Sequence, residues 1–381
     1  MTIGDILQCG KMLCSRKIPA FAVKGTLWDR LLTGYCEIKM TKVISFFNNK
    51  GGVGKTTTST NVAAGLAQKF GKKVLYIDLD PQCNSTLLIT GEEKVTDCYW
   101  INPGKTETIL DVVAPLLEDE PTIAFEKKMV NTVPNRFGVH ILMGHPRLSA
   151  IEDRLGDAWV KLAGGEIGAL RKTNWCHALL TELRGNYDYI FIDLGPSLGS
   201  LNRSALIASD FFVTPMSIDI FSIIGLRNIS DWLTQWIRRY ERGVENLIQN
   251  DQAALLDKYP VRRDLAIKSG CIGYTTQSYA TRKNKDGEKR PTHAFENILN
   301  QFGEEFVLNL GNFMADSAKE SMILGEIPNM FSLAPLAQKN SSPIRALKAS
   351  DGIFGAHYSQ AKVYSEIFDS VSANLIANTG G

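Results

Sequence analysis

Short apolar runs alternate along the chain with stretches of helical periodicity. Runs rich in β-branched and aromatic residues fall at 42–47, 74–79, 139–144, 187–193, 211–215 and 271–275. Their length and composition predict buried strands. Between the first two runs, apolar residues recur at helical spacing from Val62 to Phe70 and stop at Gly71, which is suited to end a helix. Further helices are expected over 151–184 and 222–242, so the pattern indicates an α/β protein.

The segment 48–57 joins the first strand to the first helix and has the composition of a phosphate-binding loop. Its glycines allow a tight turn with inward-facing N–H groups, and the helix that begins near Lys55 adds the positive end of its dipole. Lys55 would reach the β- and γ-phosphates, and the Thr56 hydroxyl would bind Mg²⁺, which prefers oxygen ligands. An ordinary glycine-rich turn is the alternative. We expect a nucleotide, ATP rather than GTP, bound by Lys50, Gly51, Gly52, Val53, Gly54, Lys55, Thr56 and Thr57.

This loop departs from the general P-loop formula at one position. Counting back from Gly54, the first glycine of the formula would fall at position 49, where the chain has Asn49, and a second lysine follows as Lys50. The loop thereby resembles that of the ParA/MinD family of deviant Walker A ATPases, which reads K-G-G-x-G-K-[ST]. The resemblance implies that Lys50 reaches across a nucleotide-sandwich homodimer to the partner's phosphates. The alternative is a solvated lysine that adds positive field to the loop.

A second segment similar to this family spans 74–86. It carries Asp78-Leu-Asp80-Pro at the end of a predicted strand and is close to the family's D-x-D-P-Q-G-N sequence. Cys83 stands where the family usually has glycine, so a turn that required positive φ there would be strained. The resemblance implies that Asp80 orients or deprotonates the attacking water and that Asp78 supports the metal network.

A third similar segment, 187–199, is an apolar strand that ends at Asp193 and has the Walker B pattern. Acids at the carboxyl ends of parallel strands converge on the crevice where open α/β sheets bind ligands. By resemblance, Asp193 belongs with Thr56 and Asp78 at the Mg²⁺ site. For each acid taken alone, the cap of a strand end is an ordinary alternative. The catalytic candidates are Lys50, Lys55 and Asp80.

The resemblance covers roughly 41–375 and loses specificity toward its end. It implies a doubly wound, mostly parallel sheet flanked by helices, in one ATPase domain over 40–381. Within 327–344, the sequences Ile-Pro-Asn-Met, Ala-Pro and Ser-Pro-Ile are similar to the family region that contacts adenine, although the Ala-Pro pair falls two residues early. Pro328 and Asn329 are therefore the candidates for base contacts. Residues 1–39 are expected to form an N-terminal extension of unknown role, outside the catalytic domain.

Composition restricts the remaining possibilities. With 44% apolar residues in 381, the chain can bury a large core in one domain or two. The net charge of +2 is nearly neutral, so DNA binding would need a local basic patch. The seven scattered cysteines include no C-x-x-C pair and are typical of reduced cytosolic thiols. No apolar run approaches the ~18 residues of a transmembrane helix, so we expect a cytoplasmic protein without a membrane partner.

Two basic clusters are candidates for DNA contact. The first lies on the long predicted helix and comprises Arg238, Arg239 and Arg242, interleaved with Trp232 and Trp236 at i, i+4 spacing. The second is the segment 282–290, which contains five basic residues. A solvated surface is the alternative for each cluster. The sequence leaves open which of the two would contact DNA.

The resemblance implies a slow molecular switch, in which ATP and Mg²⁺ close two subunits face to face and hydrolysis reopens them. Partition of a plasmid or chromosome over nonspecific DNA, with a ParB-like or other activating partner, is the leading expectation, and the protein would then be nucleoid-associated. A regulatory or positioning ATPase with a protein cargo and no DNA contact is the alternative. The carboxyl end lacks a basic amphipathic face for lipid, no cysteine suits a shared iron–sulfur cluster, and no helix-turn-helix is visible.

Overall fold

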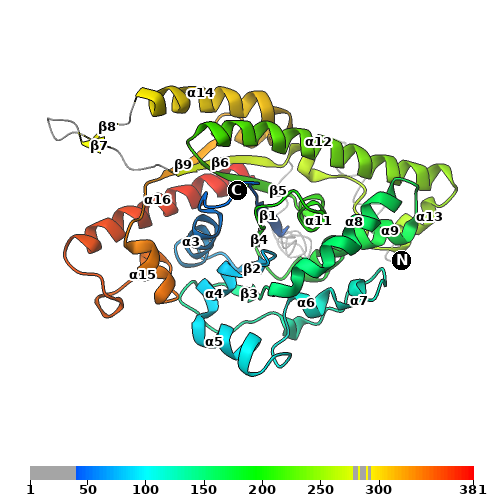
Figure 1. Cartoon of the computed structure of the whole chain (residues 1–381), viewed down its shortest axis with the longest axis horizontal. Coiled ribbons are helices and arrows are strands. Elements are labelled where there is room, and N and C mark those ends of the chain that lie inside the picture. Colours follow the sequence, from blue (N-terminus) through cyan, green and yellow to red (C-terminus); the bar gives the residue numbers. More distant parts are fainter. Residues whose placement is uncertain (1–39, 278–281, 284–288, 291–292) are drawn as a thin grey trace, which may run out of the picture. The chain divides into compact units, whose positions relative to one another are not determined.

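Seven parallel strands form one continuous sheet in the computed structural model of the chain (Figure 1). The structure describes the backbone of 40–277, 282–283, 289–290 and 293–381, and the side chains of 40–277 and 301–381. The strand order is β3-β2-β4-β1-β5-β6-β9. These strands are β1 (Lys42–Phe46), β2 (Val74–Asp78), β3 (His140–Leu142), β4 (Tyr189–Asp193), β5 (Phe211–Ser217), β6 (Cys271–Gln277) and β9 (Ile323–Ile327).

The central strands are buried on both faces. All five residues of β2 and all five of β4 are buried, which explains why both segments are continuous apolar runs rather than alternating ones. Strand β1 lies between β4 and β5, and the chain continues from it toward both edges of the sheet. The loop that leaves β1 therefore lies at the crevice where doubly wound sheets bind their ligands.

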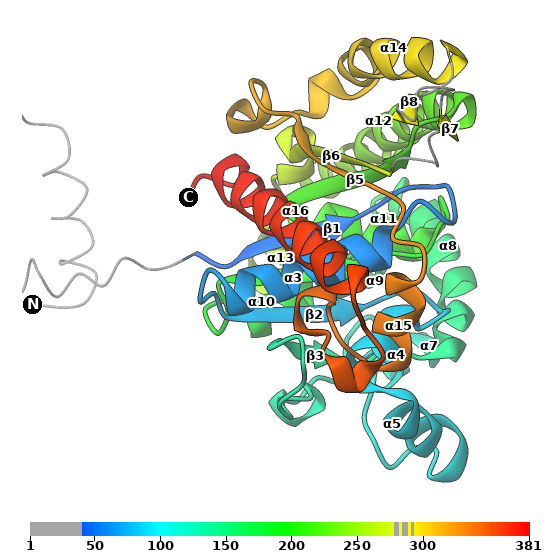
Figure 2. The same cartoon turned by 90° about the vertical axis from the view of Figure 1, so that its left-hand side faces the viewer.

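Helices cover both faces of this sheet (Figure 1). On one face α3 (Lys55–Gln68) and α16 (Ala356–Asn378) pack side by side, as both Figure 1 and Figure 2 show. On the other face α11 (Ser200–Ala208) packs against α8 (Ile151–Leu162), and α12 (Ile220–Gln249) packs along α14 (His293–Leu310). The other α-helices in the described part of the chain are α4 (Asn84–Thr90), α5 (Glu92–Thr96), α6 (Ile109–Val112), α7 (Ala114–Leu117), α9 (Ile167–Thr173), α10 (Trp175–Leu183), α13 (Ala253–Lys258) and α15 (Leu333–Lys339).

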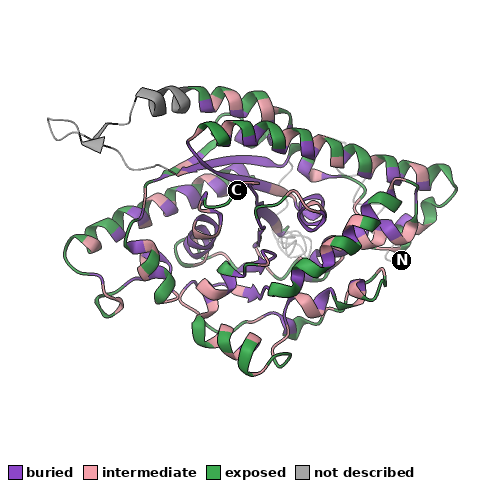
Figure 3. Ribbon diagram, in the orientation of Figure 1, coloured by how far each residue is buried: buried purple, intermediate pink, exposed green. Residues whose placement is uncertain are grey.

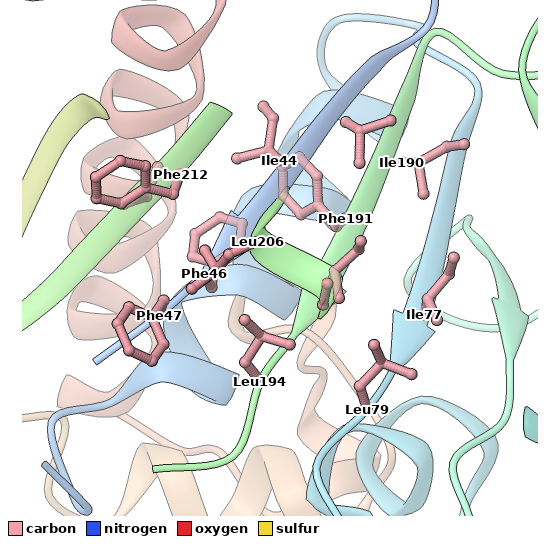
Figure 4. Close-up of a cluster of buried hydrophobic side chains, with 14 of the residues drawn as sticks. Ile44, Phe46, Phe47, Ile77, Leu79, Ile190, Phe191, Leu194, Leu206 and Phe212 are labelled. Atoms are coloured by element: carbon pink, nitrogen blue, oxygen red, sulfur yellow. The ribbon is translucent and has the colours of Figure 1, made fainter. Parts of the chain in front are cut away.

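Aromatic and branched side chains from the strands fill the core between these layers. Figure 3 shows that burial follows the sheet and the inner faces of the helices, while the outer faces are exposed. In Figure 4, Phe46 of β1 lies beside Phe191 of β4, with ring centroids 4.9 Å apart. Burying one such side chain contributes about 1.5–3 kcal/mol. The apolar runs that predict the strands therefore also stabilise the sheet that positions the loop after β1.

The structure confirms the predicted doubly wound sheet and the strands expected from the sequence. It extends the long predicted helix, since α12 begins at Ile220, directly after Asp219, whose carboxylate accepts a hydrogen bond from the Ser222 N–H at 3.0 Å. It also adds β9, an edge strand that the sequence analysis missed. The sequence Ile-Leu-Gly-Glu-Ile has a central glycine and a half-exposed first residue, so it lacks the pattern of a buried strand.

Several expectations fall on residues outside the described part of the chain or only partly inside it. The proposed N-terminal extension, 1–39, lies outside it. Within 282–290, the structure gives a short antiparallel pair of strands, β7 (Arg282–Lys283) and β8 (Lys289–Arg290), but no side chains. Among the described helices, none is both long and apolar enough to cross a bilayer.

Candidate nucleotide site

The loop between β1 and α3 has the shape of a phosphate-binding cradle. Gly52 and Gly54 have φ values of 73° and 75°, in the left-handed region that glycine adopts without strain. Gly54 stands at the start of α3 with no side-chain cap, which leaves the amino end of this 14-residue helix suited to an anion. A Cβ at Gly54 would lie 3.1 Å from Gln277 Oε1, so a side chain there would also require the end of Gln277 to move by a few tenths of an ångström.

This loop borders a cavity of about 440 Å³, a volume within the usual range for small-molecule sites. Of the loop residues expected to contact nucleotide, all except Lys50 and Val53 line it. Asp80 and Pro196 contribute from the segments that follow β2 and β4. The complete lining is Gly51, Gly52, Gly54, Lys55, Thr56, Thr57, Asn61, Asp80, Gln82, Asn84, Leu88, Pro196, Ala334, Pro335, Ala337, Gln338 and Ile344.

Part of the cavity lining away from the phosphate loop comes from α15 and Ile344, and none of it from the two residues expected to contact the base. Pro328 and Asn329 do not line the cavity, and the Asn329 carbonyl instead accepts a hydrogen bond from the Tyr364 hydroxyl at 2.6 Å. The Ala-Pro pair of α15, which falls two residues early relative to the family, does line it. The backbone N–H of Ile344 donates to Asn61 Oδ1 of α3 at 2.9 Å, so this wall is tied directly to the phosphate-loop helix.

Lys55 is buried at the bottom of the site, with 7% of its surface exposed. Its Nζ donates to the Lys50 carbonyl at 3.3 Å. Burial lowers the pKa of Lys55, while the nearby carboxylates of Asp193 and Asp80 oppose that shift. A cation held between acids at a helix amino end is placed to offset the charge of a bound phosphate.

The two acids expected at the metal lie on neighbouring strands. Asp78, the last residue of β2, is paired in register with Asp193, the last residue of β4. Asp193 Oδ2 accepts a hydrogen bond from Thr56 Oγ1 at 2.8 Å, and Asp78 Oδ2 accepts from Thr86 Oγ1 at 2.6 Å. Burial, reinforced by the charge of Asp78, raises the pKa of Asp193 to about 7, and burial raises the pKa of Asp78 to about 6.

These side chains fit a hard divalent cation. Asp193 Oδ1 is buried without a hydrogen-bond partner, and positive charge beside it would offset both its burial and its repulsion by Asp78. Among the described residues, no three histidine, cysteine or carboxylate side chains form a metal-holding group. The Thr56 hydroxyl and the Asp193 carboxylate supply oxygen atoms, and Mg²⁺ binds through one or two protein oxygens together with phosphate oxygens and water. Thr56, Asp193 and Asp78 are the residues that would hold it.

Asp80 lies between the phosphate loop and the segment after β4. Its Oδ1 accepts a hydrogen bond from the Gln82 N–H at 2.9 Å, and a Cβ at Gly195 would lie 3.3 Å from the same oxygen. Cys83, three residues later, has a φ of 53°, so the turn adopts the left-handed conformation at the position where the resemblance places glycine. A carboxylate that lines the cavity at this point can contact a water beside the outermost phosphate.

Lys50 is ion-paired within its own chain. Its Nζ donates to Asp219 Oδ2 at 2.5 Å and to Ser217 Oγ at 3.1 Å. Although burial raises the pKa of Asp219, hydrogen bonds from Lys50 and Ser217 outweigh it and hold that pKa below its usual value. The sequence analysis missed Asp219, whose signal is its position just after β5, at the same edge of the sheet as the loop.

The candidate DNA residues of α12 lie on its outer surface. Arg238, Arg239 and Arg242 are exposed, whereas Trp232 is buried and Trp236 half-buried. The arginines are therefore accessible to a partner, although the Arg239 guanidinium also lies 4.6 Å from the centroid of the Trp236 ring. The side chains of the alternative basic cluster, 282–290, lie outside the described residues.

The geometry can be compared with known proteins. The chain matches the family described as an AAA domain over residues 41–246. It is 37% identical over 194 residues to the sporulation initiation inhibitor protein Soj of Bacillus subtilis. The aligned segment covers 50% of this chain and 64% of Soj. It is 29% identical over 229 residues to the chromosome partitioning protein ParA of Caulobacter vibrioides, which covers 59% of this chain and 72% of that protein. The match therefore spans less than two thirds of Soj.

A solved structure extends the similarity to almost the whole described unit. The crystal structure of a protein from Corynebacterium diphtheriae shares 32% sequence identity, with a TM-score of 0.68. That alignment covers 89% of this chain and 99% of the other. The similarity is thus not confined to the phosphate loop and its two acidic segments.

Proposed function

Since the chain belongs to the ParA/MinD-like family of partition and positioning P-loop ATPases, we propose that it is a slow ATPase that dimerises when it binds ATP. The observation that carries this proposal is the meeting of Lys55, Asp80 and Thr56 in one cavity beneath a glycine cradle. The cavity, the helix amino end and the buried lysine together suit a nucleoside triphosphate.

Each residue has a part in binding and hydrolysis. The N–H groups at the start of α3 and Lys55 bind the phosphates, while Thr56, Asp193 and Asp78 hold the metal. When bound, Mg²⁺ neutralises charge on the β- and γ-phosphates. Asp80 orients the attacking water and accepts its proton, because it is the carboxylate that lines the cavity itself.

An apolar surface next to Lys50 supports dimerisation. The first turns of α12 leave Ile220, Phe221 and Ile224 exposed by 53%, 69% and 50%. Exposed apolar residues grouped in this way mark interaction surfaces. They follow directly after Asp219, the ion-pair partner of Lys50. A second copy that covered this surface would come close to Lys50, which could then exchange Asp219 for the phosphates of that copy.

Replacing Lys50 is expected to separate nucleotide binding from dimerisation. Lys50→Ala should bind ATP within about threefold of the wild type, since Lys50 does not line the cavity, but remain monomeric with ATP. Calorimetry measures the first quantity and light scattering the second. Lys105→Ala, which removes an exposed lysine, is the matched control and should dimerise normally. A Lys50→Ala protein that dimerises with ATP as the wild type does would refute the role of this lysine.

We further propose that the ATP-bound dimer binds DNA without sequence preference through Arg238, Arg239 and Arg242. Their exposure on one helix supplies the local basic patch that a nearly neutral chain requires, and dimerisation doubles the phosphates within reach. An activating partner protein of the ParB type is compatible with the same switch. A protein cargo without DNA contact is the alternative function, and the next experiment decides between them.

DNA binding should require ATP and weaken steeply with salt. Counterion release gives a slope of log K against log salt of about −0.9 for each phosphate neutralised, so replacing all three arginines by alanine should flatten that slope. Retardation of two unrelated duplexes across a salt series measures the effect. A protein with Lys127, Lys319 and Lys362 replaced by alanine loses equal charge elsewhere and should behave as the wild type. No retardation with ATP would favour the protein-cargo alternative.

A further inference from the structure

The carbonyl oxygen of Leu198 accepts two hydrogen bonds from the helices behind the nucleotide site. The indole Nε1 of Trp232, on α12, donates to it at 2.9 Å. The Nη2 of Arg203, on α11, donates to it at 3.1 Å. Trp232 also stacks on Phe47, at the start of the phosphate loop, with ring centroids 5.3 Å apart. One backbone oxygen therefore connects two helices with the edge of the cradle.

The loop that carries Leu198 borders the nucleotide cavity. Pro196 lines that cavity, and Gly195 packs so closely that a Cβ there would lie 3.3 Å from Asp80 Oδ1. Asn202 Nδ2 holds the loop from behind by donating to the carbonyls of Gly195 and Ser197, both at 2.8 Å. The Leu198 carbonyl therefore lies two residues along the chain from Pro196, in the same loop that packs against Asp80.

Arg203 lies between the Leu198 carbonyl and the exposed arginines of α12. Its guanidinium carbon lies 3.3 Å from the centroid of the Trp236 ring, and that of Arg239 lies 4.6 Å from the same centroid. Burial, together with the charge of Arg239, lowers the pKa of Arg203 to about 10 against the opposing effect of Glu152. Two cations at one ring repel each other, so an anion bound at Arg239 would stabilise Arg203 in its place beside Leu198.

The cluster also contains unpaired polar groups. Arg203 Nε and Trp236 Nε1 are buried and have no hydrogen-bond partner. An unpaired buried donor destabilises the arrangement that contains it. A movement of the loop that gave these two donors partners would therefore be favoured. A packed element with two arrangements is what coupling between distant sites requires.

From these contacts we infer that the Leu198 carbonyl couples the nucleotide state to the arginine face of α12, by way of Trp232, Arg203 and Trp236. This inference rests on the proposed function and adds the route by which ATP controls DNA affinity. Coupling between two binding sites is reciprocal, so DNA should strengthen ATP binding by the same factor by which ATP strengthens DNA binding. Trp232 and Arg203 are positioning residues in this account, since neither lines the nucleotide cavity.

The test compares DNA affinity with and without ATP in the full-length chain. Trp232→Phe keeps an aromatic ring beside Phe47 but removes the hydrogen bond to Leu198. We expect ATP affinity without DNA to stay within about threefold of the wild type. The ratio of the DNA dissociation constant without ATP to that with ATP should fall about tenfold. Fluorescence anisotropy of a labelled duplex measures that ratio at fixed salt, and ATP titrations with and without the duplex check the reciprocal effect.

Trp159→Phe is the matched control. Trp159 packs edge-on against Trp236 and donates its indole N–H to Ser204 Oγ at 3.4 Å, so the change removes a comparable group from the same cluster without touching Leu198. It should leave the ratio unchanged. Arg203→Lys is the second variant and keeps the charge while losing the planar stack on Trp236. It should lower the ratio even if Trp232→Phe fails to fold.

The possible outcomes separate this inference from the proposed function. A wild type whose DNA affinity does not depend on ATP would overturn the proposed DNA function and the coupling with it. A wild type that does respond to ATP, with folded Trp232→Phe and Arg203→Lys proteins that keep its ratio within about twofold, would overturn the coupling alone. A loss of coupling in both variants, with Trp159→Phe unaffected, would support the route.

Discussion

Lys55→Ala is expected to abolish measurable ATP binding, and with it ATP hydrolysis and dimerisation. The lysine is buried at the start of α3 beside Asp193 and Asp80, so its removal would leave Asp80 in the cavity and Asp193 behind it without a balancing cation. A hydrogen bond to a charged group contributes about 1.5–3 kcal/mol, and the unbalanced acids add repulsion, so an affinity loss on the order of a hundredfold or more follows. Isothermal titration calorimetry with ATP and Mg²⁺ measures it.

Lys69→Ala controls for the loss of a lysine near the same helix. Lys69 lies at the carboxyl end of α3, with 57% of its side chain exposed, and pairs weakly with Asp369 at 3.9 Å. This variant should bind ATP as the wild type does. An undiminished ATP affinity in a folded Lys55→Ala protein would contradict the assignment of the cavity to the triphosphate.

Asp80→Ala is expected to bind ATP but to hydrolyse it at least about a hundredfold more slowly, since general acid–base catalysis contributes 10²–10⁴-fold. Its carboxylate lines the cavity and faces the loop after β4, whereas Asp78 and Asp193 are fully buried behind it. Phosphate release under saturating ATP and Mg²⁺ measures the rate, and calorimetry shows that binding survives.

Asp80→Asn distinguishes a chemical role from a structural one. An asparagine oxygen can still accept the hydrogen bond that Gln82 N–H donates to Asp80 Oδ1 at 2.9 Å, so the turn is preserved while the negative charge is lost. This variant should be as slow as Asp80→Ala. Turnover close to that of the wild type in Asp80→Asn would mean that Asp80 acts through the turn and not on water.

The parts of the site that could be predicted from sequence are those fixed by local geometry. A strand followed by a glycine loop and a helix determines where Lys55 and Thr56 lie, because all three parts are contiguous in the chain. Asp78 and Asp193 could be placed together because both end apolar strands, and the structure pairs them in register on β2 and β4. That the sheet is doubly wound and mostly parallel was predicted from the resemblance and not from periodicity.

Other parts depend on contacts between segments far apart in the chain, which periodicity does not encode. The ion pair of Lys50 with Asp219 joins positions 169 residues apart, and the Asn61 contact to Ile344 joins positions 283 apart. Pro328 and Asn329 were the candidates for base contacts, but neither lines the cavity, and the chain after β9 places the Ala334-Pro335 pair of α15 there. The hydrogen bonds to the Leu198 carbonyl depend on packing between α11, α12 and a loop, and no sequence motif marks them.

The most direct test of the account is the molar mass of Asp80→Ala, measured by light scattering with ATP and Mg²⁺, with ADP, and without nucleotide. We expect a dimer with ATP alone, because hydrolysis is blocked while the surface beside Lys50 is intact, and a monomer in the other two conditions. Adding Lys50→Ala should return the ATP-bound protein to a monomer. A monomer with ATP, in a variant that calorimetry shows to be saturated, would refute the ATP-dependent dimer, as would the same molar mass under all three conditions.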